Sequence, residues 1–515
     1  MALRSRRGAR LRRAARGRAG VVALACALYL GAGASATWPA LKDARGSFLA
    51  AGQEGRGQVA PGDHLQTGYQ LWLPGHQIEE GRAPWRDPYS FQPLVEPRVN
   101  FAGWPFGVAY WPLHRALGAV EAWNAFVLLG FVGAGVFCAL WLRELEIRRG
   151  AALAGGLAYA LAPYVAGQMS AGHLLAWVSM LMPLSLFAWE RGLRRSTWWL
   201  GLSAAALASI PLSGQVHFAL GAIPFFLLYA LVRRRAVPVA AGAAVLGIGA
   251  GFLVYAAAIR GSVGSGSRSF AQVERYSAEP SDFLSRDADW SEEFVFLGWL
   301  TPLLALAGLI VLIAARRYRL GALLAAGVGV PVLLALGGNL PGYETLWRNL
   351  PGLRDTRVPE RLMPIACLAI AALAAHAVTR LRWPGTAAIV AALLLLDLHV
   401  GVFERARADE KNEAYAALRG APPGRVLELP VRPPDRQEAS AYLYYAMQGQ
   451  REHPSGYSTL APREADRELR RLARDPCAGL EQLGVRYLAL HGGGRTCGGR
   501  RLARDGPTSL YSLTR

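Results

Sequence analysis

The stretch "AGGLAYALAPYVAGQMSAGHLLAWVSMLMPLSLFAWERGLRR" (154–195) contains two apolar blocks, a short turn rich in small residues and a closing cluster of arginines. Crossing the hydrocarbon core of a bilayer as a helix takes about 20 residues, so each block is close to the length of one span. The turn "GQMSAGH" (167–173) predicts a tight helical hairpin between them. The arginines predict that the second block ends in the cytoplasm, because short cytoplasmic loops carry an excess of basic residues.

The same pattern extends over most of the chain. Hydrophobic residues make up 53% of the sequence and charged residues only 18%, below the roughly 25% usual for soluble domains. We therefore predict an all-α polytopic membrane protein with about eleven spans and a small α/β domain at the C-terminus. The predicted spans are residues 20–37, 121–142, 150–167, 172–190, 197–213, 215–232, 237–258, 294–315, 320–337, 362–380 and 384–403.

The distribution of charge predicts the orientation in the membrane. The formal net charge is +20, and eight arginines precede the first apolar segment. Further basic clusters interrupt the apolar segments at 143–149, 191–195, 233–235, 316–319 and 380–382. One orientation places all of them in the cytoplasm, as the positive-inside rule requires. No basic stripe interleaved with aromatic residues occurs, so we expect no nucleic-acid partner.

This orientation divides the chain into a basic cytoplasmic N-terminus (1–19), a membrane domain (20–403) and an extracytoplasmic tail domain (404–515). The long loops all fall outside, so any site built from polar residues is expected on the outer face of the cytoplasmic (inner) membrane. The predicted outer loops are residues 38–120, 259–293 and 338–361. The first segment is interpreted as a retained span; a cleavable signal peptide ending near "ASA" (34–36) is the alternative.

The tail alternates in the manner of strands at 425–431, 483–491 and 509–513, with a charged helix at 463–475. It also contains Cys477 and Cys497. An extracytoplasmic location would permit a disulfide between them, but the sequence leaves this open.

The first outer loop contains the densest group of candidate site residues. In "APGDHLQTGYQLWLP" (60–74), Asp63 precedes apolar residues at helical spacing, which predicts an interfacial helix over 65–80 at the lipid edge. A carboxylate there is suited to act as a general base on an acceptor hydroxyl. The structural alternative is that Asp63 is the N-cap of the helix. His64 and Tyr69 are candidate substrate-binding residues beside it.

A divalent cation that neutralises a leaving phosphate is a second role for this loop. The candidate ligands are Asp63, Asp87, Glu79 and Glu80, although their spacing does not require a metal. Asp87 is also a candidate catalytic residue. Because it precedes a proline in "RDPYS" (86–90), its structural alternative is a residue that caps a turn.

A phosphate leaving group would be bound by cations, and Arg354, Arg357 and Arg361 stand just before the tenth predicted span. Arginine suits phosphate because its planar fork donates two hydrogen bonds at once. Ordinary contacts with lipid headgroups are the alternative for these arginines. His173 and His217 fall at predicted outer turns, where they are candidates to face the same cavity.

The chain resembles the YfhO-like bacterial membrane proteins, within the GT-C-fold glycosyltransferases that use polyprenyl-phosphate sugars. The resemblance is carried by four stretches in order, at residues 62–91, 154–195, 213–220 and 350–370. It implies transfer of a sugar from a polyprenyl-phosphate carrier to an envelope glycan, glycolipid or wall polymer. It also implies a catalytic acid in the first outer loop, at the position of Asp63. Related chains often carry asparagine where Asp87 stands, and the adjacent acid pair of several GT-C enzymes is missing from this loop.

We therefore predict an inverting membrane glycosyltransferase with Asp63 as base and Arg357 and Arg361 as ligands of the carrier phosphate. A flippase for lipid-linked glycans is one alternative, but it would favour polar residues in the middle of several spans and matching broken helices. A non-catalytic envelope assembly factor is the other.

Overall fold

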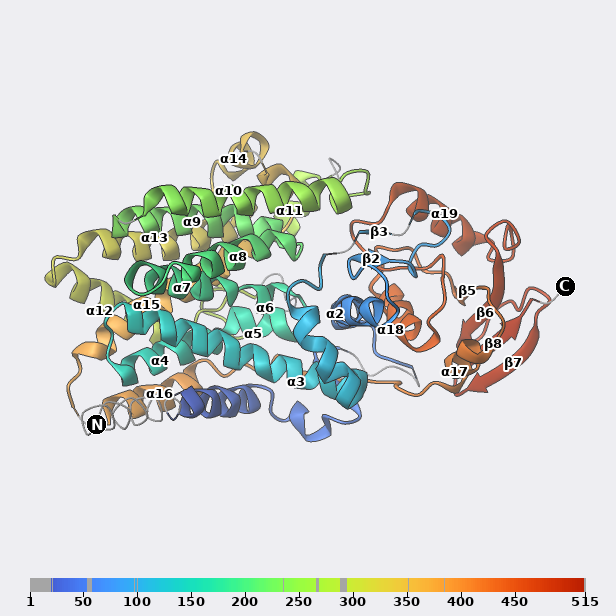
Figure 1. Ribbon diagram of the computed structural model, residues 1–515, viewed down its shortest axis with the longest axis horizontal. Coiled ribbons are helices and arrows are strands. Elements are labelled where there is room, and N and C mark those ends of the chain that lie inside the picture. The colour runs from blue at the N-terminus through green and yellow to red at the C-terminus, as the bar shows by residue number, and fades with distance from the viewer. Residues whose placement is uncertain are drawn as a thin grey trace, which may run out of the picture.

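The computed structural model describes residues 20, 22–52, 58–96, 98–99, 101–234, 236–264, 268–287, 294–350, 352–383 and 385–513. The predicted N-terminal segment 1–19 lies outside these residues. Figure 1 shows a long bundle of helices and, at one end of it, a domain that contains a β-sheet. We call the region where the bundle meets this C-terminal domain the junction.

An apolar helix overlaps each of the eleven predicted segments. Five of the described helices are long and apolar enough to cross a membrane, or six if the bent pair α4–α5 counts as one span, so the count of eleven is not confirmed. The bundle consists of a helix at Val22–Ala36, α3 (Phe106–Glu144), α4 (Arg149–Ala160), α5 (Pro163–Ser170), α6 (Leu175–Val178), α7 (Leu181–Arg194), α8 (Trp198–Leu212), α9 (Val216–Arg233), α10 (Val237–Val254), η2 (Tyr255–Ile259), α12 (Leu300–Ala314), α13 (Tyr318–Ala335), η5 (Pro359–Leu362), α15 (Met363–Arg380) and α16 (Thr386–Asp397).

The predicted span at 150–167 is broken rather than continuous. Helices α4 and α5 meet at an angle of 43°. Pro163 opens α5, and Ala162 before it has the extended backbone (φ −49°, ψ 121°) that a following proline favours. The predicted turn before the next helix is present, but α5 continues to Ser170, so the turn begins at residue 171, four residues later than expected.

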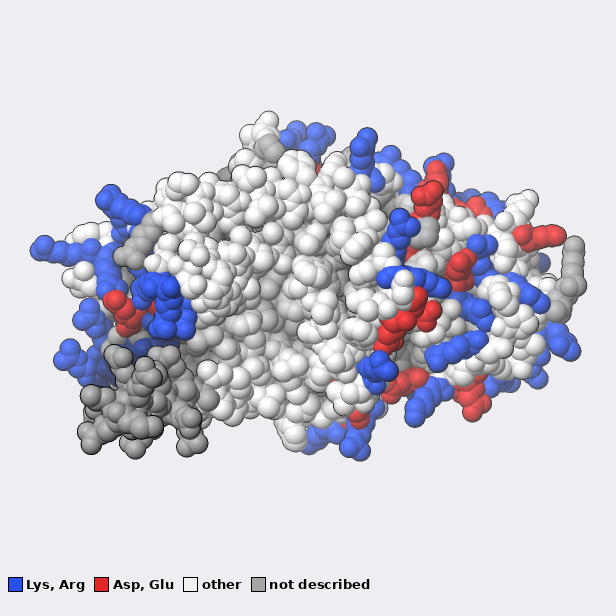
Figure 2. Space-filling model, in the orientation of Figure 1, with Lys and Arg blue, Asp and Glu red and all other residues white. Residues whose placement is uncertain are grey.

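Helix α15 lies at the centre of the bundle, where every residue from Met363 to Val378 is buried. The outer helices instead expose large apolar side chains, among them Phe252, Leu303 and Leu396. Figure 2 shows the result as an uncharged band across the visible face of the bundle. Such a band is suited to contact with lipid, because exposing this apolar surface to water would cost a large amount of free energy.

Several predicted cytoplasmic loops meet at the end of the bundle opposite the junction. Glu144 lies 2.9 Å from Arg191, and Glu190 lies 2.6 Å from Arg233. These ion pairs join the ends of α3, α7 and α9. Figure 2 shows basic side chains gathered at this end and a mixture of acidic and basic side chains on the C-terminal domain. We call this the basic end; the clustering of its arginines agrees with the predicted loop pattern.

The C-terminal domain is built on a four-stranded sheet in the order β5-β6-β8-β7. Strands β5 and β6 are parallel, and the other two pairs are antiparallel. The three predicted strands and the charged helix are confirmed. Strand β7 was not predicted, because its sequence "RRLARD" (500–505) is largely exposed and lacks apolar alternation. The elements of the domain are β5 (Arg425–Leu429), β6 (Val485–His491), β7 (Arg500–Asp505), β8 (Thr508–Ser512), α17 (Glu413–Gly420), η6 (Gln437–Ala439), α18 (Ser440–Gly449) and α19 (Arg463–Arg474).

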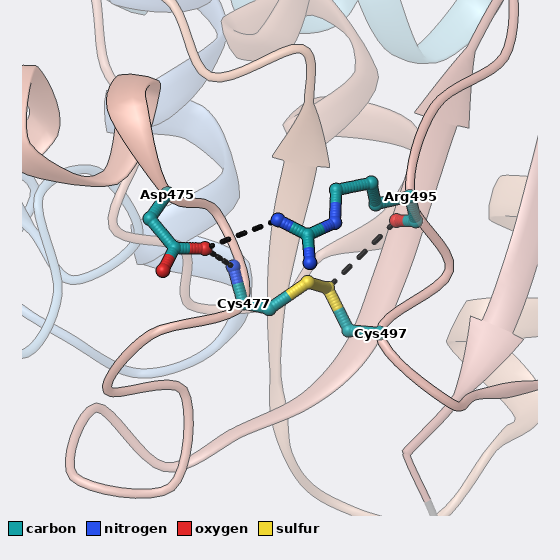
Figure 3. Close-up of a disulfide and its surroundings, with 4 residues drawn as sticks. All are labelled: Asp475, Cys477, Arg495 and Cys497. Carbon is teal, nitrogen blue, oxygen red and sulfur yellow. Dashed lines mark hydrogen bonds and ion pairs between the residues drawn. A yellow bond between two sulfur atoms is a disulfide. The ribbon is translucent and has the colours of Figure 1, made fainter.

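A disulfide joins Cys477 to Cys497 across 20 residues, which settles the pairing that the sequence left open. Figure 3 shows the surrounding contacts. The carboxylate of Asp475 accepts a hydrogen bond from the backbone N–H of Cys477 and lies 3.5 Å from the guanidinium of Arg495. The disulfide therefore ties the loop after α19 to the loop before β7.

The first predicted outer loop is a structural part of the junction. Strand β1 (Ser47–Ala50) pairs antiparallel with β4 (Glu404–Arg407), which links this loop to the start of the tail.

The remaining elements of the chain lie within or at the edge of the predicted outer loops. These are η1 (Ala40–Asp43), α2 (Asp63–Glu79), β2 (Arg86–Asp87), β3 (Arg98–Val99), α11 (Phe270–Arg275), η3 (Gly337–Asn339), α14 (Tyr343–Asn349) and η4 (Leu353–Asp355).

Helix α2 corrects the prediction of an interfacial helix at the lipid edge. It lies between α3 and α18, and most of its residues are buried. Tyr69 and Trp72 pack with Leu443 and Tyr457 of the C-terminal domain. The apolar residues that suggested a lipid contact are used on both sides of the helix for contacts within the protein.

Candidate active site

Asp63 is the first residue of α2. The N-cap is Gly62 and not Asp63, and no side chain caps the helix, so the structural alternative for Asp63 does not hold. Its carboxylate instead points to the turn between α5 and α6. A carboxylate in the first turn of a helix is also stabilised by the partial positive charge of the unpaired N–H groups there.

Gly172 allows the turn after α5 to approach α2 closely. Gly172 has φ +83°, and a Cβ atom there would lie 2.2 Å from the backbone nitrogen of His64. The hydroxyl of Thr67 donates a hydrogen bond to the carbonyl of Gly172 at 2.7 Å. A Cβ atom on Gly62 would lie 2.5 Å from the ring of His64. This close packing places His173 beside Asp63.

Both carboxylate oxygens of Asp63 have partners. Nε2 of His173 lies 2.9 Å from Oδ2, and the hydroxyl of Tyr457 donates a hydrogen bond to Oδ1. The side chain of Asp63 remains 24% exposed. An ionised carboxylate has about four lone-pair sites, so two partners leave capacity for a further hydrogen bond.

A second set of hydrogen bonds connects His173 to Arg361. The side-chain oxygen of Gln168 lies 2.7 Å from Nδ1 of His173 and accepts a hydrogen bond from Arg361 at 2.9 Å. A guanidinium can only donate, so the atom facing it is the amide oxygen, and Nδ1 must carry a proton to bond the same oxygen. Nε2, the other ring nitrogen, faces Oδ2 of Asp63 at 2.9 Å.

The environment of Asp63 keeps it ionised. Burial would raise its pKa, but the hydrogen bond and charge of His173, the hydroxyl of Tyr457 and the charge of Arg361 together lower it below the usual value. Asp63 is therefore a carboxylate at neutral pH.

Three arginines lie within electrostatic range of His217, namely Arg268, Arg357 and Arg361. Arg361 belongs to η5, directly before α15, and its side chain is 18% exposed. Arg357 lies over the ring of Tyr276, 5.3 Å from its centroid. Burial and the charge of Arg357 lower the pKa of Arg268. We call Arg268, Arg357 and Arg361 the arginine cluster.

Arg268 was not predicted as a site residue, because it stands in a mixed-charge loop with no local pattern to distinguish it. Its Nε–H is buried and has no hydrogen-bond partner among the described residues. Like charges placed together repel, and a buried donor without a partner costs free energy. Both features suit an anion. Arg354 is exposed on η4.

His64 and Tyr69 are buried packing residues in this structure. His64 is 1% exposed and lies between Phe48 and Trp123, with ring centroids at 5.2 and 6.1 Å. Burial lowers the pKa of His64 to about 4, so its ring is neutral at physiological pH. Tyr69 is 2% exposed and donates its hydroxyl hydrogen bond to Asp87.

Asp87 is separated from this cluster and stabilises a turn. It is 4% exposed and accepts four hydrogen bonds, from the hydroxyls of Tyr69 and Ser90 and from the backbone N–H groups of Tyr89 and Ser90. This arrangement is the one expected if Asp87 caps a turn, which was the structural alternative to a catalytic role.

The candidate metal ligands do not come together. Glu79 accepts hydrogen bonds from Trp111 and Arg115, and Glu80 faces Arg82 at 4.0 Å. Across the described part of the chain, no three His, Cys, Asp or Glu side chains form a group that would hold a metal ion. The donor set therefore does not fit a metal at Asp63, and no chemical step is assigned to one.

Two cavities lie near the C-terminal end of α2. One of about 480 Å³ is lined by residues that include Gln77, Arg82 and Trp85. A smaller one of about 160 Å³ is lined by Trp72, His76 and Glu79, among others. Gln77 is 14 residues from Asp63, which is about 20 Å along a helix. The contacts of Asp63, rather than the size of a cavity, therefore define the candidate site.

No known family profile and no curated protein matches the chain. Among solved structures, the arabinofuranosyltransferase AftD from Mycobacteria is 15% identical, with a TM-score of 0.55; the alignment covers 96% of this chain and 41% of that one. The oligosaccharyltransferase AglB from Archaeoglobus fulgidus, in complex with an inhibitory peptide and a dolichol-phosphate, is 11% identical over 92% of this chain and 69% of that one, with a TM-score of 0.49. ArnT from Cupriavidus metallidurans is 14% identical over 97% and 98%, with a TM-score of 0.41.

These proteins are GT-C-fold glycosyltransferases. The similarity to the arabinofuranosyltransferase has a TM-score above 0.5 and establishes the fold; at 15% identity it establishes nothing further. The chain thus has the GT-C fold of a multi-pass membrane protein. Membership of the YfhO-like group stays a prediction.

Proposed function

We propose that this protein is an inverting membrane glycosyltransferase that moves a sugar from a polyprenyl-phosphate carrier to an acceptor hydroxyl. The observation that carries the proposal is the connection between Asp63 and Arg361 through His173 and Gln168. It places an ionised carboxylate and a phosphate-binding cation in one cluster, on a fold shared with glycosyltransferases.

The arginine cluster supplies the site for the carrier phosphate. Among the described residues, Arg268 and Arg357 have no carboxylate within ion-pair distance, so an incoming phosphate would be their counter-ion. Arginine is suited to this role because it binds phosphate oxygens in pairs. The cluster therefore binds the donor and stabilises the negative charge that grows on the phosphate as the sugar leaves.

Asp63 acts on the acceptor. Its open part accepts a hydrogen bond from the acceptor hydroxyl and takes the proton as that oxygen attacks the anomeric carbon. The bond between the anomeric carbon and the phosphate oxygen breaks, and the electron pair leaves with the phosphate. Attack from the face opposite the phosphate inverts the anomeric centre. His173 holds the carboxylate in place through Oδ2. Positioning of the donor and the acceptor next to this carboxylate supplies much of the rate enhancement.

The reaction belongs on the outer face of the cytoplasmic membrane. Disulfides persist in oxidising compartments, so the Cys477–Cys497 bond favours an extracytoplasmic C-terminal domain. The arginines of the opposite end favour the cytoplasm for that end. An envelope glycan, glycolipid or wall polymer is the acceptor class available there.

The test uses purified full-length protein in detergent with radiolabelled polyprenyl-phosphate pentoses and hexoses. The expected result is release of polyprenyl phosphate with transfer of the sugar to water or to an added glycan acceptor, and its loss in Asp63→Asn. An assembly factor would tolerate this substitution. A flippase would move the lipid across a liposome membrane without breaking the sugar–phosphate bond, and that outcome would reject the proposal.

A further inference from the structure

The C-terminal domain contributes a residue to the candidate active site. Tyr457 follows α18 and is 394 positions after Asp63 in the sequence, yet its hydroxyl donates a hydrogen bond to Oδ1 of Asp63. The membrane domain supplies the other partner of this carboxylate, His173 on Oδ2. The carboxylate is therefore held between the two domains.

Tyr457 is itself fixed by its surroundings. It is 9% exposed and packs in a cluster with Trp72 and Leu443. Its backbone carbonyl accepts a hydrogen bond from Gln66, one turn along α2, at 2.8 Å. On the other side of Asp63, the backbone N–H of Gly62 donates to the hydroxyl of Ser440 at the start of α18. The C-terminal domain thus contacts α2 both before and after Asp63.

We propose that Tyr457 is a positioning residue and that the C-terminal domain completes the active site by orienting Asp63. The proposal rests on the proposed function. A carboxylate can rotate about its Cβ–Cγ bond unless both oxygens are held. With His173 on one oxygen and Tyr457 on the other, the plane of the carboxylate is set, and a remaining lone pair is directed toward the exposed side.

The hydroxyl of Tyr457 has a second effect, because a hydrogen bond to the ionised form of an acid favours that form. The groups that face Asp63 are His173 from the α5–α6 turn, Arg361 from η5, His64 from α2 and Tyr457. His64 is neutral at physiological pH. Tyr457 is therefore the one group among these four through which the C-terminal domain influences the proton affinity of Asp63.

The experiment compares Tyr457→Phe with Tyr442→Phe in the full-length protein. Tyr442 is a matched control, because it is a buried tyrosine of the same domain whose hydroxyl donates to the carbonyl of Pro430. The readouts are kcat and KM for a radiolabelled polyprenyl-phosphate sugar as a function of pH, the melting temperature, and binding of undecaprenyl phosphate.

For Tyr457→Phe we expect kcat to fall about tenfold, with KM for the donor and binding of undecaprenyl phosphate unchanged. The acid limb of the kcat profile should move up by about one pH unit, because a lost hydrogen bond to the carboxylate raises the pKa of the base. Tyr442→Phe should keep the wild-type profile. Gln66→Ala should show a smaller fall in kcat in the same direction, because it loosens Tyr457 without removing the hydroxyl.

Wild-type kcat and an unmoved acid limb in Tyr457→Phe would overturn the inference. So would a lower melting temperature with reduced kcat and an unmoved limb, since that pattern indicates a structural role alone. Activity in Asp63→Asn would instead reject the proposed function itself, so the two failures can be told apart.

Discussion

The two ends of the helix bundle each hold carboxylates beside arginines, but the clusters differ in how completely their charges are paired. At the basic end, Glu190 is fully buried and lies within 4 Å of both Arg233 and Arg194. At the junction, Asp63 is partly exposed. Among the described residues, Arg268 and Arg357 have no carboxylate within ion-pair distance. A cluster in which arginines pair with a buried carboxylate joins helices, whereas a cluster that contains arginines without an ion pair is suited to a ligand. This contrast distinguishes the ion-pair cluster at the basic end from the candidate active site at the junction.

Among the substitutions that test this contrast, Asp63→Asn should have the largest effect on turnover. An asparagine keeps the shape but cannot take a proton, so sugar transfer should fall about 10²- to 10⁴-fold. The measurement is turnover of a labelled polyprenyl-phosphate sugar.

Asp87→Asn is the matched control for Asp63→Asn. Because Asp87 accepts four hydrogen bonds in a turn, this variant should lose thermal stability and retain activity per folded molecule. Equal loss of turnover in both variants would contradict the division of roles.

At the basic end, Glu190→Gln should destabilise the protein by about 2 kcal/mol, because it removes the charge of a buried carboxylate that pairs with the partly exposed guanidinium groups of Arg194 and Arg233. Thermal unfolding in detergent measures this change. Turnover at saturating donor, measured below the unfolding temperature, should stay at the wild-type level. A loss of turnover without a change in stability would mean that the basic end takes part in the reaction.

Arg361→Ala should weaken binding of undecaprenyl phosphate by about 10- to 100-fold, the range expected for a lost hydrogen bond to a charged group. Arg348→Ala offers a control, since Arg348 is an exposed arginine of α14 that pairs with Glu344. Binding is measured without any sugar on the carrier, so the result does not depend on catalysis. Equal affinities for the two variants would remove Arg361 from the phosphate site.

The smallest expected effect is on the pH profile of the wild-type protein. The pKa of Asp63 is lowered, so the carboxylate stays ionised as the pH falls and takes a proton only below the ordinary range of an aspartate, about pH 4. Activity that depends on this base should therefore hold down to about pH 4 and decline below it. A decline that begins near neutral pH would indicate that another group sets the acid limb.

Part of the site was predictable from local sequence. Asp63 and Arg361 stand beside apolar segments in loops that the charge pattern assigns to one face, and the structure brings both into one cluster. His173 was a candidate for the same reason. Asp87, His64 and Tyr69 stand in the same predicted loop as Asp63 but are occupied by packing and turn contacts, which a sequence pattern does not reveal.

Other members of the cluster gave no signal in the sequence. Arg268 stands in a mixed-charge loop, and Tyr457 lies in a segment of the tail without a motif. Gln168 looked like one polar residue of a predicted turn. Each of them becomes a site residue only through a contact with a segment distant in the chain, and a single sequence contains no record of which distant segments touch.

The sequence by itself determined the apolar segments, the arginines that gather at one end and the strands of the tail, because hydropathy and periodicity act over a few neighbouring residues. The tertiary structure alone decided that α2 is enclosed by α3 and the C-terminal domain instead of lying on lipid. It also decided that Asp63, His173, Gln168, Arg361 and Tyr457 meet. That meeting depends on how whole helices pack and on the close approach that Gly172 permits, so it is a property of the assembled chain.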